Sequence, residues 1–192
     1  MKYKNFVSIS HNKMNGYDID RNEDRFDGIN KSVNLIDNPK TELKETDKGK
    51  GLFAKERISA GEFISEFDGE VYIGDEEEGW NEDIINHAIQ FEPNKWKDSN
   101  SLARCANHSC DANCGIKELF KLIAMRDILP GEEITWDYEM TEDLEEKDWY
   151  LDCKCNSINC RRKIGTYRNL PKERREKYKG FISEWLIKKY GE

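Results

Sequence analysis

Three cysteines near the C-terminus are the clearest candidates for metal chemistry. Cys153, Cys155 and Cys160 lie within eight residues, in a stretch too hydrophilic to bury them as ordinary core residues. Thiolates this close together favour zinc, and a closed zinc site needs four ligands in a tetrahedron. Free surface thiols are the weaker alternative, because exposed reactive cysteines are chemically costly in a cell. A fourth ligand must come from elsewhere, and the candidates are Cys105, Cys110, Cys114 and the histidines.

Two further segments combine polar and aromatic groups that could hold a small molecule. One reads Asn107-His108-Ser109-Cys110 and the other reads Thr135-Trp136-Asp137-Tyr138. An isolated histidine or tyrosine is more often a packing residue, so their meaning depends on the surrounding pattern. Gly49 and Gly51 would let the backbone approach a ligand closely, although turn glycines without a ligand are commoner.

The elements around these residues are predicted to be short strands. Leu52-Phe53-Ala54 follows a glycine turn, and a second turn is indicated at Ala60-Gly61-Glu62. The same pattern recurs at Lys121 to Met125, and Pro130-Gly131 separates two further extended pieces. The middle of the chain is therefore expected to be rich in β-structure.

The two ends of the chain differ from this middle. Apolar residues after Pro171 recur at steps of three and four, which predicts helix, and Gly180 is expected to bend or split it. Residues 1–37 show no clean periodicity and are read as an N-terminal extension, with a loosely packed arm as the simplest structure.

Size, composition and charge limit the classes of function. With 192 residues the chain suits one domain with additions, and its 5 Trp, 8 Tyr and 8 Phe provide core material. The net charge of -8 argues against direct nucleic-acid binding and favours a basic peptide partner. Neither a membrane-spanning run nor a signal-peptide core is evident. We therefore expect a soluble intracellular protein, in the cytoplasm or the nucleus, without membrane contact and monomeric.

From about Pro39 to Tyr167, the sequence resembles the SET-domain protein lysine methyltransferases. The two most specific matches are the segment from Arg104 to Asn113 and the segment from Gly131 to Tyr138. Gly49 to Ala54 looks like the family's N-terminal glycine motif, and the cysteine tail looks like a post-SET zinc module. Cys105 and Ala112 depart from the family's usual aromatic residue and proline.

The resemblance implies a mainly β fold of several small sheets, with a knot-like crossing of the segments that carry Asn107 and Tyr138. A post-SET zinc loop and a C-terminal helix complete the expected α+β architecture. The implied organisation is an extension at 1–37, a SET domain at 38–140, a zinc module at 141–167 and a helical segment at 168–192.

The resemblance also implies an activity and the residues that perform it. The expected reaction transfers methyl groups from S-adenosylmethionine to a lysine amine in a protein substrate, either a histone or a nonhistone protein. Tyr138 would be the catalytic residue, because its family counterpart has a hydroxyl near the transferred methyl group. The implied cofactor-binding residues are Gly49, Lys50, Gly51, Leu52, Arg104, Asn107, His108 and Tyr138. The implied ligands of Zn²⁺ are Cys110, Cys153, Cys155 and Cys160, which leaves Cys105 and Cys114 free.

Three points remain open at this level. Arg104 could contact the cofactor's carboxylate or pair with an acid of the fold. Trp136 occupies a channel position where the family's tyrosine restricts methylation, so without that hydroxyl we expect more than one methyl to be added. The competing functions are a catalytically silent SET-fold module that binds peptides and a purely structural zinc protein.

Overall fold

A computed structural model describes residues 37–47, 49–74, 79–144 and 149–191 of the chain. The strands are β1 (Thr41–Thr46), β2 (Gly49–Ala54), β3 (Phe63–Glu66), β4 (Val71–Ile73), β5 (Ile89–Glu92), β6 (Lys95–Lys97), β7 (Asn107–His108), β8 (Cys114–Lys117), β9 (Lys121–Ala124), β10 (Thr135–Trp136), β11 (Leu151–Asp152) and β12 (Lys163–Ile164). The helices are α3 (Glu82–His87), α4 (Lys172–Lys177) and α5 (Glu184–Tyr190), with 3₁₀ helices η2 (Leu102–Cys105), η3 (Tyr138–Met140) and η4 (Tyr167–Asn169).

These strands form small sheets, as the resemblance implied. In the described part of the chain their orders are β1-β2, β10-β7, β11-β12, β3-β9-β8 and β4-β6-β5. The pairing of β7 with β10 is parallel, whereas the other pairs are antiparallel. The expected β-rich fold of several sheets is therefore confirmed.

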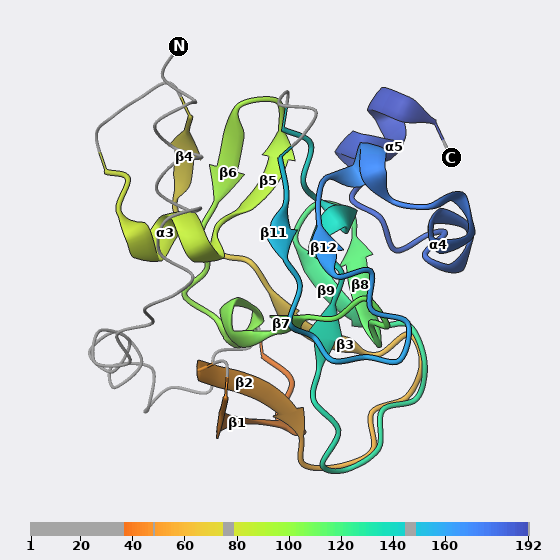
Figure 1. The fold of residues 1–192 in the computed structure, drawn as a ribbon. Helices are drawn as coiled ribbons and strands as arrows, with labels where there is room; N and C mark the ends of the chain where they lie inside the picture. The colour runs from red at the N-terminus through yellow and green to blue at the C-terminus, as the bar shows by residue number, and fades with distance from the viewer. Residues whose placement is uncertain (1–36, 48, 75–78, 145–148, 192) are drawn as a thin grey trace.

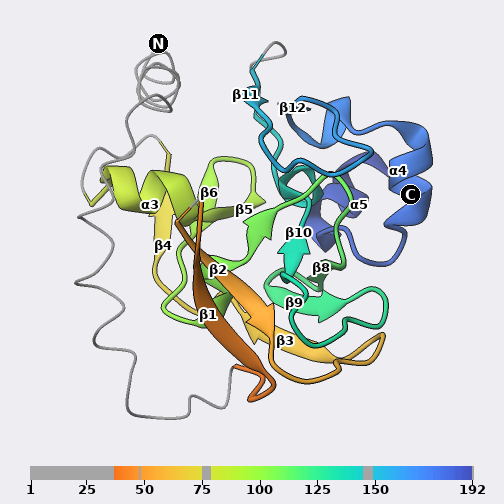
Figure 2. The same ribbon diagram turned by 60° about the horizontal axis from the view of Figure 1, so that its bottom comes forward.

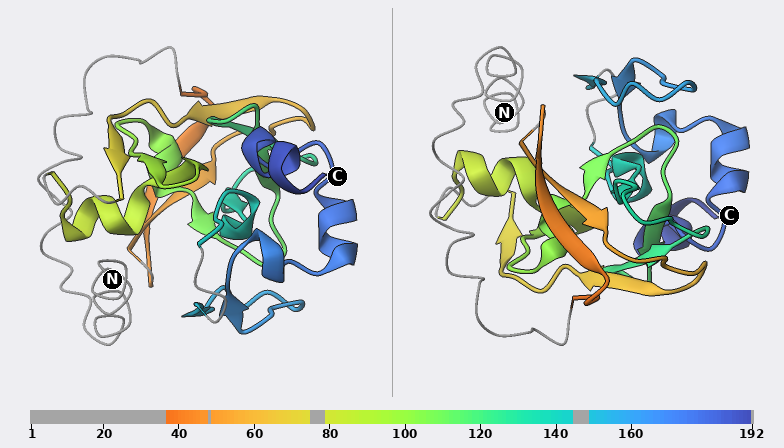
Figure 3. Two further views of the ribbon diagram at one scale, coloured as in Figure 1. Left: turned by 90° about the horizontal axis from the view of Figure 1, so that it is seen from above. Right: turned by 90° about the horizontal axis from the view of Figure 1, so that it is seen from below.

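The hydrophobic core lies among the small sheets, and further elements flank it on two sides of the molecule. Helix α3 and the β4-β6-β5 sheet lie on one side of the molecule, and α4 and α5 lie on the other (Figures 1 and 3). The β1-β2 hairpin crosses the front of the molecule in Figure 2. Burying apolar strand residues between these layers is the main stabilising contribution. The fully buried residues of this core include Leu52, Ile58, Ile64, Ile116, Leu122, Ile128 and Ile134.

The turns and the helical end follow the sequence signals. The turns at Ala60-Gly61 and Pro130-Gly131 are both present. The C-terminal helix is split into α4 and α5, and Gly180 between them has φ 78°, a conformation that glycine adopts without steric cost. Proline is favoured at the first helical position, but Pro171 stands one residue earlier, directly before the first residue of α4.

The predicted domain boundaries remain predictions. Residues 1–36 lie outside the described part, but Asp37, the last residue of the predicted extension, forms a bridge with Ser65. Its carboxylate accepts hydrogen bonds from the Ser65 hydroxyl at 2.5 Å and from the Leu102 amide at 2.9 Å. Among the described helices, none has the length and apolar character that a bilayer crossing requires.

Candidate active site and cysteine cluster

The two motif segments meet in the parallel pairing of β7 with β10. Asn107 is opposite Thr135, and His108 is opposite Trp136. The pairing continues beyond the strands, because the Ser109 amide donates a 3.0 Å hydrogen bond to the Trp136 carbonyl. Tyr138 begins η3 and is separated from the end of β10 by one residue, and it is therefore brought beside a segment thirty residues earlier in the chain.

Tyr138 is held by its two aromatic neighbours. Its ring centroid lies 4.9 Å from that of Trp136 and 5.2 Å from that of His108. Its backbone N–H also donates a 3.3 Å hydrogen bond to Nδ1 of His108. Ring contacts and a backbone bond together fix both the position and the direction of the tyrosine.

The Trp136 side chain is buried and packs beside the Tyr138 ring. Only 4 % of it is exposed, and its indole N–H donates a 3.1 Å hydrogen bond to the Ala106 carbonyl. The indole also packs against Phe67 at a centroid distance of 5.8 Å. The indole therefore cannot turn away without losing a buried hydrogen bond.

The glycine motif reaches this site through Asn107 and an acid that the sequence analysis did not single out. The Asn107 amide donates a 2.8 Å hydrogen bond to Glu133 Oε1 and lies 3.5 Å from the Lys50 carbonyl. A Cβ on Gly51 would stand 3.0 Å from the same Glu133 oxygen, so a larger residue would press on this junction. The Gly131-Glu132-Glu133 match was the only available signal for Glu133.

Leu52 and Arg104 have structural contacts of their own. The Leu52 side chain is fully buried, and its carbonyl accepts a hydrogen bond from Ile134. The Arg104 guanidinium lies 2.6 Å from Asp83 Oδ2 and 3.3 Å from Asp98 Oδ1. Arg104 thus pairs with acids of the fold, the second of its two expected roles, and its cofactor contact remains only a prediction.

Three of the four expected zinc ligands lie together. The sulfurs of Cys110, Cys153 and Cys155 and a ring nitrogen of His108 all lie within 4.8 Å of one another. Cys110 Sγ and Cys153 Sγ are 3.6 Å apart. Two sulfurs bound at about 2.3 Å to one tetrahedral zinc would be about 3.8 Å apart, so the spacing fits a shared metal.

The electrostatic surroundings favour a thiolate at Cys155. Burial raises the pKa of this thiol, but hydrogen bonds from the Ser157 hydroxyl and the Cys110 amide outweigh it and lower the pKa to about 6. Metal ligation requires thiolates, so these donors favour cation binding at Cys155, whereas burial raises the pKa of the Cys110 and Cys153 thiols.

Cys160 stands at the edge of this cluster. It packs against the small cluster formed by Cys110, Cys153 and Ile164, and its Sγ lies 3.9 Å from the Cys153 carbonyl oxygen. It does not belong to the mutually close set, in which His108 takes the fourth place. The whole tail is a loop closed by β11 and β12, because the Cys153 amide bonds to the Arg162 carbonyl.

The remaining two cysteines are core residues. Cys105 and Cys114 both pack in the main hydrophobic cluster. Burial raises the pKa of the Cys105 thiol to about 12 and raises that of Cys114 as well, so both stay neutral thiols. Their surroundings agree with the expectation that neither binds the metal.

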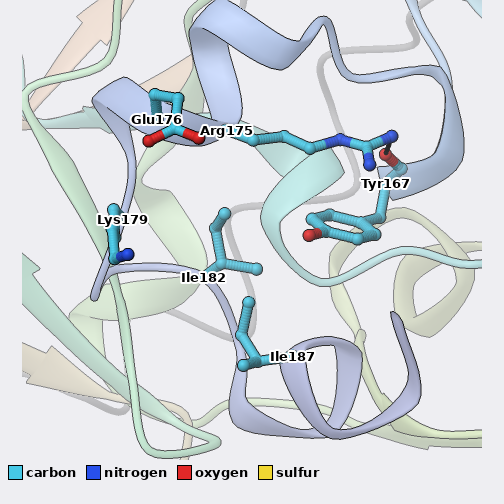
Figure 4. Close-up of a pocket in the computed structure, with 6 residues that line it drawn as sticks. All are labelled: Tyr167, Arg175, Glu176, Lys179, Ile182 and Ile187. Carbon is cyan, nitrogen blue, oxygen red and sulfur yellow. Dashed lines mark hydrogen bonds between the residues drawn. The ribbon is translucent and has the colours of Figure 1, made fainter. Parts of the chain in front are cut away.

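The pocket drawn in Figure 4 lies elsewhere, in the C-terminal segment. Its lining includes Tyr167, Arg175 and Ile182, and its volume is about 60 Å³. That space holds no more than a few water molecules, so this pocket does not compete with the β7-β10 site for a cofactor.

Comparison with known proteins identifies the domain that carries the β7-β10 site. Residues 49–139 match the family model described as "SET domain". The chain contains a SET domain. This SET domain includes the glycine motif, Asn107 and Tyr138, whereas the cysteine tail after residue 139 lies outside the match.

Curated relatives of this SET-domain protein are named as histone methyltransferases. It is 32 % identical over 151 residues to "Histone-lysine N-methyltransferase ASHH3" of Arabidopsis thaliana, covering 69 % of this chain and 40 % of that protein. It is 34 % identical over 130 residues to "Histone-lysine N-methyltransferase 2B" of Homo sapiens, covering 59 % of this chain and 5 % of that protein. The chain thus spans less than half the length of either relative.

Solved structures with a similar fold contain SAH. One is KRYPTONITE with mCHG DNA and SAH, at TM-score 0.51 and 26 % identity, covering 65 % of this chain and 29 % of that chain. Another is KRYPTONITE with mCHH DNA, an H3(1-15) peptide and SAH, at TM-score 0.50, 25 % identity and the same coverage. DNA in those complexes belongs to KRYPTONITE, and the expectation that this SET-domain chain does not bind nucleic acid stays a prediction.

Proposed function

We propose that this chain transfers methyl groups from S-adenosylmethionine to the side-chain amine of lysine in a protein substrate. The observation that carries the proposal is the parallel pairing of β7 with β10, which sets Tyr138 beside Asn107 and His108. The histone-methyltransferase names of the relatives and the SAH in the KRYPTONITE structures support it.

Methyl transfer mainly requires that the amine, the methyl group and the sulfur are aligned and that water is excluded. Methyl transfer to an amine is an in-line displacement, so no covalent nucleophile of the protein is needed. S-adenosylmethionine, when bound, supplies a methyl group on a positively charged sulfur. The lysine must attack as a neutral amine although its usual pKa is about 10.4, and a desolvated channel beside positive charge favours loss of the proton.

Each residue of the site has a role in this proposal. The Tyr138 hydroxyl orients the incoming amine, while Trp136 and His108 hold the tyrosine ring in place. The backbone of Gly49 to Gly51 and the Asn107 segment would hold the cofactor, and Glu133 fixes the Asn107 amide. The buried indole of Trp136 keeps water away from one side of the channel.

The proposed substrate is a lysine-containing basic protein or peptide, histone or nonhistone. The net charge of -8 favours such a partner, because opposite charge raises the rate of encounter. The KRYPTONITE complex with an H3(1-15) peptide supports the same class of substrate. A monomer acting inside the cell, in the cytoplasm or the nucleus, is part of this proposal.

We also propose that Cys110, Cys153, Cys155 and Cys160 hold a structural Zn²⁺. Since the Tyr138 amide donates to Nδ1 of His108, the neutral ring carries its proton on Nε2. A protonated Nε2 cannot give a lone pair to a metal, so it would donate to Cys110 Sγ, which is 3.4 Å away. Cys160 then remains as the fourth ligand, and it would have to move closer on binding.

A cofactor-binding test and a transfer test separate this function from a silent binding module. Titration calorimetry should detect one site for S-adenosylmethionine, and mass spectrometry should locate labelled methyl groups on lysines of histones or of a cell lysate. A protein that binds basic peptides but transfers no label to any lysine would overturn the proposal in favour of the module.

A further inference from the structure

Arg161 extends from the cysteine tail into the interior, to the two acids on either side of Tyr138. Its guanidinium nitrogens lie 2.7 Å and 2.9 Å from the two oxygens of Asp137. The second nitrogen also lies 3.2 Å from Glu139 Oε2. A bidentate pair of this kind fixes both partners in direction as well as distance.

The backbone of Arg161 contacts the cysteine cluster itself. Its amide donates a 3.4 Å hydrogen bond to Cys110 Sγ. A single residue therefore touches a proposed metal ligand through its main chain and the residues flanking Tyr138 through its side chain.

The Arg161 guanidinium balances two buried carboxylates. Asp137 and Glu139 are 0 % and 2 % exposed. Burial and the neighbouring Asp137 raise the pKa of Glu139 to about 7. Withdrawing the cation would leave two acids close together in a poorly solvated place, which is strongly unfavourable.

Asp137 is also the N-cap of η3, the 3₁₀ turn that begins with Tyr138. Its side chain accepts a 3.3 Å hydrogen bond from the Glu139 amide, and its carbonyl accepts one from Met140. A displacement of Asp137 would therefore move the turn and the tyrosine with it.

We propose that Arg161 is a positioning residue that transmits the folding of the metal-binding tail to Tyr138 through Asp137 and Glu139. This inference rests on the proposed function for its effect on catalysis, but the structural coupling stands apart from any reaction. An ordered tail holds the guanidinium against Asp137, and a loosened tail withdraws it. Tyr138 is then held in its active position only when the metal-binding tail is folded.

The first test measures structure without activity. In Arg161→Met the amide donor to Cys110 remains, so one equivalent of zinc should be retained, while hydrogen exchange of the Met140 and Thr141 amides should become at least about 10-fold faster. Chelating zinc from the wild type should accelerate the same amides, and chelation should add little further in Arg161→Met. Lys154→Met removes an exposed cation from the same tail and should change neither quantity.

The second test measures the reaction. Arg161→Met should lower kcat by about 10- to 100-fold, because small misplacement of a reacting geometry has effects of this size, with KM for the cofactor changed less than about 2-fold. Adding Glu139→Gln to Arg161→Met should restore part of kcat, because it removes one uncompensated acid. Arg161→Lys keeps the positive charge but loses the bidentate pair, so its kcat should lie between those of the wild type and Arg161→Met. It replaces Arg161→Met in both tests if that variant does not fold.

Unchanged amide exchange around η3 in a zinc-loaded Arg161→Met or Arg161→Lys protein would overturn the inference. Loss of zinc in both variants would also overturn it, because Arg161 would then act only within the tail. If the wild type transfers no methyl group, the proposed function fails, whereas the exchange measurements still decide the coupling.

Discussion

The backbone N–H of Tyr138 donates a 3.3 Å hydrogen bond to Nδ1 of His108. This bond crosses the β7-β10 junction and ties the proposed catalytic residue to the segment of the cysteine cluster. Replacing His108 with Ala should destabilise the fold by about 1–3 kcal/mol, the cost of leaving a partly buried amide unpaired. Chemical unfolding would measure this loss.

The matched variant is His108→Asn, whose side-chain oxygen can occupy nearly the position of Nδ1. It should lose less stability than His108→Ala, because the acceptor for the Tyr138 amide is kept. Equal losses of stability in the two variants would show that His108 does not stabilise the fold through this hydrogen bond.

Substitutions of the proposed metal ligands should have different effects from substitutions of the core cysteines. Cys110→Ser and Cys153→Ser should abolish zinc binding and lower Tm by on the order of 10 °C, because metal binding at such sites acts as folding energy. Cys105→Ser should retain one equivalent of zinc. Elemental analysis with thermal unfolding gives both quantities.

Cys160→Ser and His108→Asn decide the fourth ligand. The protonation of His108 inferred from its bond to Tyr138 predicts that Cys160→Ser loses zinc and that His108→Asn keeps it. Loss of zinc in His108→Asn and its retention in Cys160→Ser would identify His108 as the ligand and would contradict the inferred proton on Nε2.

Stability should depend on pH through Glu142. Burial of its carboxyl group raises the pKa from 4.5 to about 7 against the opposing Gln90 amide. The folded state therefore binds more protons than the unfolded state between these pKa values, so the free energy of unfolding should fall as pH rises from about 4.5 to about 7. Glu142→Gln should flatten part of this slope, leaving the contribution of Glu139, which has the same sign.

Denaturant unfolding at several pH values would check this slope. Glu173→Gln, an exposed substitution on α4, is the control and should leave the pH dependence unchanged. An identical slope in Glu142→Gln and the wild type would contradict the buried-carboxyl explanation.

Trp136 should permit more than one methyl transfer per lysine. Its indole N–H is used by the Ala106 carbonyl, so no donor from this side chain crowds the channel beside Tyr138. Mass spectrometry of the product should find dimethyl-lysine or trimethyl-lysine. Monomethyl-lysine alone, unchanged in Trp136→Phe, would contradict the expectation.

The sequence allowed prediction where local motifs were specific. The Asn107 and Tyr138 segments matched family motifs closely enough to predict that they meet, and the Pro130-Gly131 turn and the Gly180 split followed from backbone preferences. The fold class and the meeting of these two segments could therefore be predicted from the sequence alone.

The remaining features depend on contacts between residues far apart in the chain. Arg104 pairs with Asp83, twenty-one residues away, and neither residue carries a local signal for the pair. Arg161 reaches Asp137 in the same way. Helix α3 and strands β5 and β6 occupy a region without clear periodicity, because such short elements are determined by packing more than by propensity.

The most direct measurement is transfer of a labelled methyl group from S-adenosylmethionine to lysine by the wild type, Tyr138→Phe and Tyr150→Phe. The account predicts labelled lysine with the wild type and with Tyr150→Phe, which alters a tyrosine outside the site, and about a 100-fold lower kcat with Tyr138→Phe at unchanged zinc content and Tm. Equal transfer by Tyr138→Phe and the wild type, or no label on lysine from any of them, would contradict it.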